Sequence, residues 1–137
     1  MITLKEYFGA WWSHPDHTPE ADTNAHSLLA AVANLGREML TAGVVFPVNR
    51  KTGSIISGLL YGGFRPQSCH EGAPNSAHKQ GLAVNIFDPR NEIDAWIMAH
   101  QDALKRHGLY IEHPDKTVGW SHWTLRAPQS GKRIFYP

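Results

Sequence analysis

Hydrophobic residues recur every three or four positions in the first half of the chain, which predicts an amphipathic helix over residues 24–40. Its apolar face is formed by Ala25, Leu28, Leu29, Val32, Leu35 and Met39. Asp22 or Thr23 can cap the start of this helix, and Gly43 can end it. We therefore expect one long helix to pack an apolar face against the rest of the protein.

A second helix is predicted at about residues 94–107, where basic residues suit the C-terminal end of the helix dipole and Gly108 follows. Short segments rich in β-branched and aromatic residues predict four strands, at residues 54–57, 83–87, 109–112 and 120–125. A loop rich in Gly and Pro covers residues 58–74, and such loops often carry function. This order of elements indicates an α+β fold with helices packed on a small antiparallel sheet.

Length and composition narrow the function classes. The 137 residues have the size of one domain, so we expect residues 1–137 to fold as a unit and as a monomer. A net charge of +1 argues against general binding to nucleic acid or to a membrane surface. No apolar run approaches the roughly 18 residues of a membrane span, and the first residues do not resemble a secretory signal, so we expect synthesis in a cytoplasm. The single cysteine, Cys69, excludes an internal disulfide.

Two histidines in separate segments are the strongest candidates for metal ligands. His78 lies just before the expected strand at residues 83–87, and His122 lies inside the last expected strand. If these strands are neighbours, both imidazoles and the side chain of Asn85 can converge. Two imidazoles can hold Zn²⁺ and leave a coordination position open for water, as in hydrolytic zinc sites.

The motifs around these histidines resemble those of a known family. Ser-x-His followed by Gly-x-Ala and a polar residue covers residues 76–85, and a late Trp-x-His covers residues 120–122. Ser-Gly at residues 57–58 and Phe-Arg-Pro at residues 64–66 together resemble the family's Ser-Gly-Tyr-Arg-Pro segment, with extra residues inserted between them. From about residue 28 onward the chain resembles the zinc D-alanyl-D-alanine carboxypeptidase-like family of LAS metallopeptidases, in its compact phage-associated form. The resemblance implies the hedgehog/D-Ala-D-Ala-peptidase fold and Zn²⁺ as the cofactor.

The resemblance also assigns a role to each matching residue. His78 and His122 match the family's two histidine ligands, and Arg65 matches the arginine that stabilises the oxyanion formed on a peptide carbonyl. Position 85 matches the third ligand, which is Asp in the family and Asn85 here. A neutral amide oxygen is a weaker ligand for Zn²⁺ than a carboxylate, so we expect reduced affinity. Asp88 is close by, but an offset of three residues in a strand points to the other face of the sheet.

The general base is a second departure from the family pattern. The family usually has an acid three residues before the final histidine, where this chain has Gly119. Glu112, at the end of the preceding expected strand, is the preferred replacement, and Asp115 is the second candidate. Either carboxylate must come within hydrogen-bond reach of the attacking water.

The resemblance implies a zinc-dependent peptidase that hydrolyses peptidoglycan stem or cross-link peptides, at a bond that involves a D-amino acid. It also fits a phage or prophage origin and action on the cell wall, with no nucleic-acid or membrane partner. The alternative is a non-catalytic phage structural or cell-wall-binding relative that retains the fold with a weakened metal site. A third hypothesis is a metal-independent carbohydrate-binding domain that uses the Trp-rich last strand.

Overall fold

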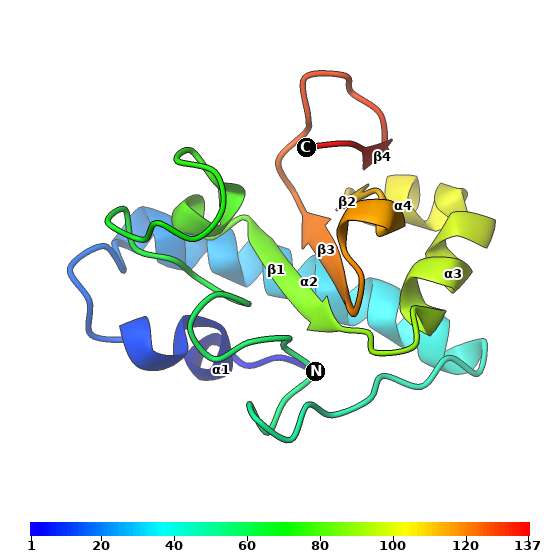
Figure 1. Cartoon of the computed structure of the whole chain (residues 1–137), viewed down its shortest axis with the longest axis horizontal. Helices are drawn as coiled ribbons and strands as arrows, with labels where there is room; N and C mark the ends of the chain where they lie inside the picture. Colours follow the sequence, from blue (N-terminus) through cyan, green and yellow to red (C-terminus); the bar gives the residue numbers. More distant parts are fainter.

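The computed structural model describes residues 1–137 as an α+β fold, which confirms the expected fold class (Figure 1). The helices are α1 (Leu4–Phe8), α2 (Pro19–Thr41), α3 (Glu92–Ala99) and α4 (Gln101–His107), with short 3₁₀ turns η1 (Gly9–Trp11), η2 (Ala77–Gln80) and η3 (Pro114–Lys116). The strands are β1 (Ala83–Phe87), β2 (Tyr110–Glu112), β3 (Trp120–Thr124) and β4 (Ile134–Phe135). No helix combines the length and the apolar character that a membrane crossing requires.

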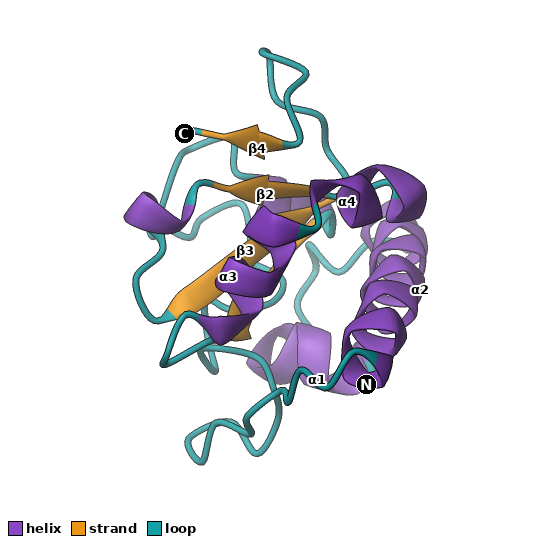
Figure 2. Cartoon of the chain, turned by 90° about the vertical axis from the view of Figure 1, so that its right-hand side faces the viewer, coloured by secondary structure: helices purple, strands orange, loops and turns teal.

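The sheet is mixed rather than purely antiparallel. Its strand order is β1-β3-β2-β4, and β3 runs antiparallel to both of its neighbours. The two-residue strand β4 pairs in parallel with β2 at the edge of the sheet, as Figure 2 shows. The sequence analysis missed β4 because two residues give no periodic pattern. The condition for convergence is met, because β1 and β3 are neighbours, and this pairing brings the candidate site together.

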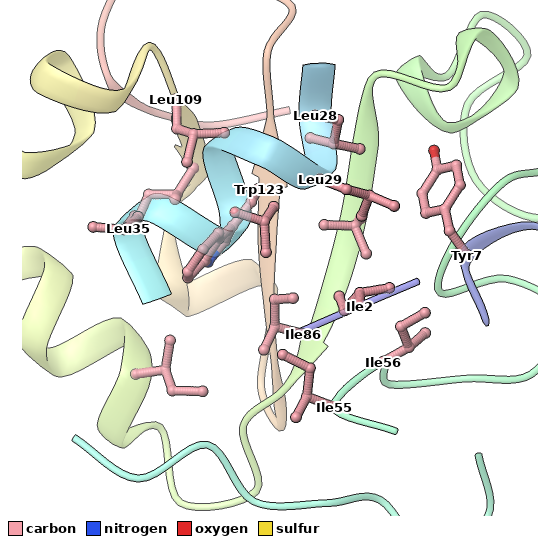
Figure 3. Packing of buried hydrophobic residues seen from close by; sticks show 14 of the residues in the cluster. Ile2, Tyr7, Leu28, Leu29, Leu35, Ile55, Ile56, Ile86, Leu109 and Trp123 are labelled. Atoms are coloured by element: carbon pink, nitrogen blue, oxygen red, sulfur yellow. The ribbon is translucent and has the colours of Figure 1, made fainter. Parts of the chain in front are cut away.

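Side chains on the two faces of the sheet have different surroundings. Val84 and Ile86 of β1 and Trp123 of β3 belong to one core cluster of 23 buried residues, together with the apolar face of α2. Figure 3 shows leucines of α2 beside Ile86 and Trp123. Because successive side chains of a strand alternate between faces, Asn85 and His122 point to the opposite face. The long helix therefore covers one face of β1 and β3 and leaves the other for a cleft.

The helix α2 begins five residues earlier than predicted. Thr18 is its N-cap and accepts a hydrogen bond from the backbone N–H of Ala21, and Pro19 occupies the first turn. This Thr-Pro pair is a strong start signal, but the first turn carries little apolar periodicity. Gly43 adopts φ +88° just beyond the helix, as expected of a glycine that ends one.

Two other predicted elements were wrong. Residues 54–57 form only isolated bridges, Asn49 with Ser54 and Ile56 with Ile86, because the Asn49 side chain bonds backbone groups of this loop instead. The helix predicted at residues 94–107 is divided into α3 and α4 at His100, which has φ −135°. The His100 ring stacks on Trp96 with centroids 4.0 Å apart, and its Nδ1 bonds the Trp96 carbonyl at 2.7 Å.

Candidate functional site

The fold brings the predicted site residues to one open cleft with a volume of about 500 Å³. They come from the Gly/Pro-rich loop, η2, β1, β2 and β3, so only the tertiary structure joins them. The predicted residues that line this cleft are Arg65, His78, Asn85, Glu112 and His122. Because these side chains converge there, the cleft is the candidate functional site.

His78 is held in a single orientation. It lies in η2, and the Ser76 hydroxyl caps this turn by accepting a hydrogen bond from the His78 backbone N–H at 3.2 Å. Ser76 therefore orders the loop. The His78 Nδ1 lies 2.7 Å from the Gly63 carbonyl oxygen, to which it donates. This bond puts the proton of the neutral ring on Nδ1 and leaves the Nε2 lone pair for a ligand.

Asn85 and His122 are direct partners in the sheet. They face each other in the register of β1 and β3, and His122 Nδ1 lies 2.8 Å from Asn85 Oδ1. The rings of His78 and His122 are inclined at 59°, with centroids 5.2 Å apart. Two imidazoles and one amide oxygen therefore meet at the floor of the cleft.

Both imidazoles are neutral at neutral pH. Burial lowers the pKa of His78 well below 6.5, and the positive charges of His122 and Arg65 act in the same direction. Burial also lowers the pKa of His122 to about 4, with further contributions from Arg65 and Arg126. Metal-binding imidazoles must be neutral, so the protonation state of the pair suits a metal.

The third ligand position is the weak part of a zinc site here. Nowhere does the chain bring together three His, Cys, Asp or Glu side chains that could hold a metal ion. Asp88 does not replace the missing acid, because its buried carboxylate accepts hydrogen bonds from the backbone N–H groups of Ile93 and Asp94 at the start of α3. The imidazoles fit Zn²⁺, whereas Asn85 offers only a neutral oxygen.

Arg65 is a buried cation without an acidic partner. Only 7% of the residue is exposed, and it takes part in no ion pair. Its Nε donates to the Tyr61 carbonyl at 2.8 Å and its Nη1 to the Glu71 carbonyl at 3.2 Å. A Cβ on Gly72 would lie 2.6 Å from Arg65 Nη1, so a glycine lets the loop close over the guanidinium. An uncompensated charge that lines a cleft suits an anionic ligand or a developing oxyanion.

Of the two candidate bases, only Glu112 lines the cleft. Burial raises the pKa of the Glu112 carboxyl, and the charges of Arg65 and Lys116 partly offset this. The Asp115 side chain is 72% exposed and lies beside His113, away from the cleft. Gly119 adopts φ +93°, a conformation that is unfavourable for an acidic residue.

The structure adds residues that the sequence analysis did not assign to the site. They are Glu71, Trp120, Arg126 and Phe135, among others. The alternation of His122, Thr124 and Arg126 was a usable signal for Arg126, but nothing in the sequence indicated that the C-terminal segment forms a wall. Trp123 is fully buried in the core, which leaves Trp120 as the exposed aromatic residue of β3.

Comparisons with known proteins add no family assignment. A scan against family models, a search of curated proteins and a search of solved structures found no match to this chain. The geometry of the cleft and the motifs of the sequence are therefore the two indications of function.

Proposed function

We propose that this protein is a zinc-dependent peptidase that hydrolyses peptidoglycan stem or cross-link peptides at a bond involving a D-amino acid. One observation carries the proposal: two neutral imidazoles, an unpaired buried arginine and a half-buried carboxylate line the same open cleft. These are the groups that water attack on a peptide carbonyl requires. The motif resemblance supplies the substrate class and the cell wall as the place of action.

His78 and His122 are the residues that would hold the zinc ion, with the amide oxygen of Asn85 as the third donor. Zinc bound there would polarise the scissile carbonyl and lower the pKa of a water molecule to near neutrality. The Gly63 carbonyl fixes the His78 ring by accepting from Nδ1, the usual arrangement behind a metal-binding histidine. His122 Nδ1 and the Asn85 amide oxygen lie 2.8 Å apart, so zinc held by both atoms would replace the hydrogen bond between them.

The chain's own residues perform the proton transfer and the charge stabilisation. Glu112 would take a proton from the attacking water and return it to the leaving amine. Its raised pKa brings it closer to the working pH, which favours both transfers. Arg65 would donate hydrogen bonds to the oxyanion of the tetrahedral intermediate, and its burial strengthens this interaction because water competes less.

One observation favours the alternative of a non-catalytic relative. The hydrogen bond of 2.8 Å pairs Asn85 Oδ1 with His122 Nδ1 without a metal ion. It places a proton on His122 Nδ1 that coordination through that atom would have to remove. A protein with this closed pair would use the cleft to bind a cell-wall peptide without cleaving it.

Metal content and peptide hydrolysis, measured together, test the proposal. Untagged protein should contain close to one zinc per chain after equilibration with the ion, and His122→Ala should contain none. With zinc present, the protein should release new amino termini from purified peptidoglycan or from stem peptides. If cross-linked and D-Ala-terminated substrates all stay intact while zinc is bound, the non-catalytic role replaces the peptidase.

A further inference from the structure

Arg126 is a second cation of the cleft that the proposed chemistry does not use. It follows the end of β3, two residues beyond Thr124 and four beyond His122, and all three line the cleft. Its Nη1 donates to the Gln80 Oε1 at 2.8 Å, and it takes part in no ion pair. Its other guanidinium N–H groups have no hydrogen-bond partner in the protein.

The backbone that carries Arg126 is fixed by a small set of hydrogen bonds. The Thr124 hydroxyl donates to the Leu82 carbonyl at 2.9 Å and accepts from the Arg126 backbone N–H at 3.0 Å. The backbone N–H of Leu125 donates to the same Leu82 carbonyl at 2.9 Å. These bonds tie the end of β3 to the residue before β1, and Gln80 holds the side chain from η2. The backbone at Arg126 is therefore fixed before any ligand arrives, which reduces the entropy lost on binding, and one exposed hydrogen bond to Gln80 orients the guanidinium.

The lining of the cleft carries no net positive charge, and what favours an anionic group on the ligand is that its two arginines are unpaired. Arg65 and Arg126 line the cleft together with Glu71 and Glu112, but neither arginine pairs with either carboxylate. Arg65 is buried and held by two backbone carbonyls, whereas Arg126 is only half-buried and retains free donors. The two cations therefore suit different tasks. Arg65 suits an oxyanion that develops during the reaction, and Arg126 suits a group that is already charged in the free ligand.

We propose that Arg126 is a specificity-determining residue that binds a carboxylate of the peptide substrate, separate from the scissile carbonyl. A guanidinium with free N–H groups binds a carboxylate through paired hydrogen bonds, which gives both affinity and orientation. The substrate class that follows is a short peptide with a free carboxylate close to the bond that is cleaved. This inference rests on the proposed peptidase function for its substrate, but the carboxylate contact itself is measurable without cleavage.

A stem peptide has two sources of such a carboxylate, its C-terminus and the free carboxyl group of its D-Glu residue, so three probes are needed. The first is an acetylated L-Lys-D-Ala-D-Ala extended by the preceding D-Glu residue. The second carries a C-terminal amide, and the third carries D-Gln in place of D-Glu. Calorimetric titration without added metal measures binding of each, and cleavage is measured separately with zinc. One of the two neutral probes should bind about 10- to 100-fold more weakly than the first, the range expected when a hydrogen-bonded charge is removed.

Four variants separate a role in ligand binding from a structural role. Arg126→Gln should remove the preference for the charged probe, and Arg126→Lys should keep part of it because the charge remains. Gln80→Ala removes the link to η2 but not the charge, so it should keep most of the preference. Arg90→Gln makes the same chemical change at an exposed arginine outside the cleft and should change nothing.

The outcomes distinguish this inference from the proposed function. If the charged probe is preferred through Arg126 but no probe is cleaved, the carboxylate contact stands and the peptidase proposal fails. If the probes are cleaved with no preference among them, the peptidase stands and the role of Arg126 is overturned. The inference is also overturned if none of the probes binds, if Gln80→Ala removes the preference as fully as Arg126→Gln, or if Arg126→Gln retains it.

Discussion

Asn85 and His122 face each other across β1 and β3, and their side chains are joined by a hydrogen bond of 2.8 Å. By the motif resemblance alone, this pair would correspond to an aspartate and a histidine that share a zinc ion. An aspartate opposite a histidine would supply a negative charge, whereas the amide supplies only a dipole. We therefore expect residue 85 to determine whether the site binds zinc tightly or keeps the hydrogen bond between residues 85 and 122 without a metal ion.

Replacing Asn85 with Asp should tighten zinc binding at least 10-fold, because it supplies a carboxylate ligand. Mutation of a residue that only hydrogen-bonds to a metal ligand already changes metal affinity by about 10- to 100-fold. Calorimetric titration of both proteins at the same pH measures the difference. His122→Ala provides the baseline and should bind no zinc at this site. Equal affinities of Asn85→Asp and the unchanged protein would mean that residue 85 is not a ligand.

The positions of His78, Asn85 and His122 within their elements could be predicted from local signals, whereas their convergence required the pairing of β1 with β3, which the sequence left as a condition. Alternation along β1 and β3 places Asn85 and His122 on one face, and the motif before β1 places His78 at its start. The apolar spacing of α2 was equally readable, because a long helix repeats its pattern over several turns. What these signals share is that neighbouring residues in the chain determine them.

Other parts depended on the pairing of distant strands or on specific side-chain contacts, which a periodic pattern does not show. The parallel pairing of β4 with β2 involves residues more than 20 positions apart, and it builds one wall of the cleft. The break at His100 depends on stacking with Trp96, which competes with the continuation of the helix. The loop at residues 54–57 has the composition of a strand, but side-chain hydrogen bonds from Asn49 replace most of its ladder.

Replacing Arg65 with Ala should reduce turnover by about 100- to 1,000-fold, the usual loss when one oxyanion donor is removed. Zinc content should change far less, because Arg65 is not a ligand. Arg65→Lys tests whether charge alone suffices; it should recover little, since a lysine cannot reproduce the guanidinium fork. Steady-state hydrolysis and elemental analysis of the same samples check this. Loss of zinc in parallel with turnover would contradict the assignment.

The buried histidines should make the protein less stable in mild acid. The pKa of His122 falls from 6.5 to about 4 on folding, so between these values the unfolded chain binds the proton more readily. The contribution of His122 to the free energy of unfolding is complete above pH 6.5 and is lost as the pH falls towards 4. The free energy of unfolding, measured with urea across this range in metal-free protein, should therefore decrease with falling pH.

Titration of Asp94 changes the free energy of unfolding in the opposite direction, so its effect has to be measured separately from that of the histidines. Burial raises the pKa of Asp94 to about 6 from 3.8, so its contribution is present below pH 3.8 and is lost as the pH rises through 6. Asp94→Asn keeps an oxygen for the Ser121 hydroxyl and removes this titration. Stability of the variant should fall more steeply with acid than that of the unchanged protein. An identical pH profile would mean that Asp94 does not titrate in this range.

Replacing Glu112 with Gln should reduce turnover by about 100- to 10,000-fold, because the amide cannot accept the proton of the attacking water. Folding should be retained, since Glu112 is half-buried at the end of β2 and makes no side-chain hydrogen bond or ion pair that the change would break. Asp115→Asn is the matched control, because it removes an exposed carboxylate that lies three residues away and outside the cleft. Its turnover should stay within about twofold of that of the unchanged protein, since exposed ion pairs contribute little energy. Circular dichroism and zinc content show whether fold and metal site are intact in each variant. Activity lost with Asp115→Asn and retained with Glu112→Gln would reverse the assignment, and activity retained in both would mean that the water is activated without a carboxylate from the chain.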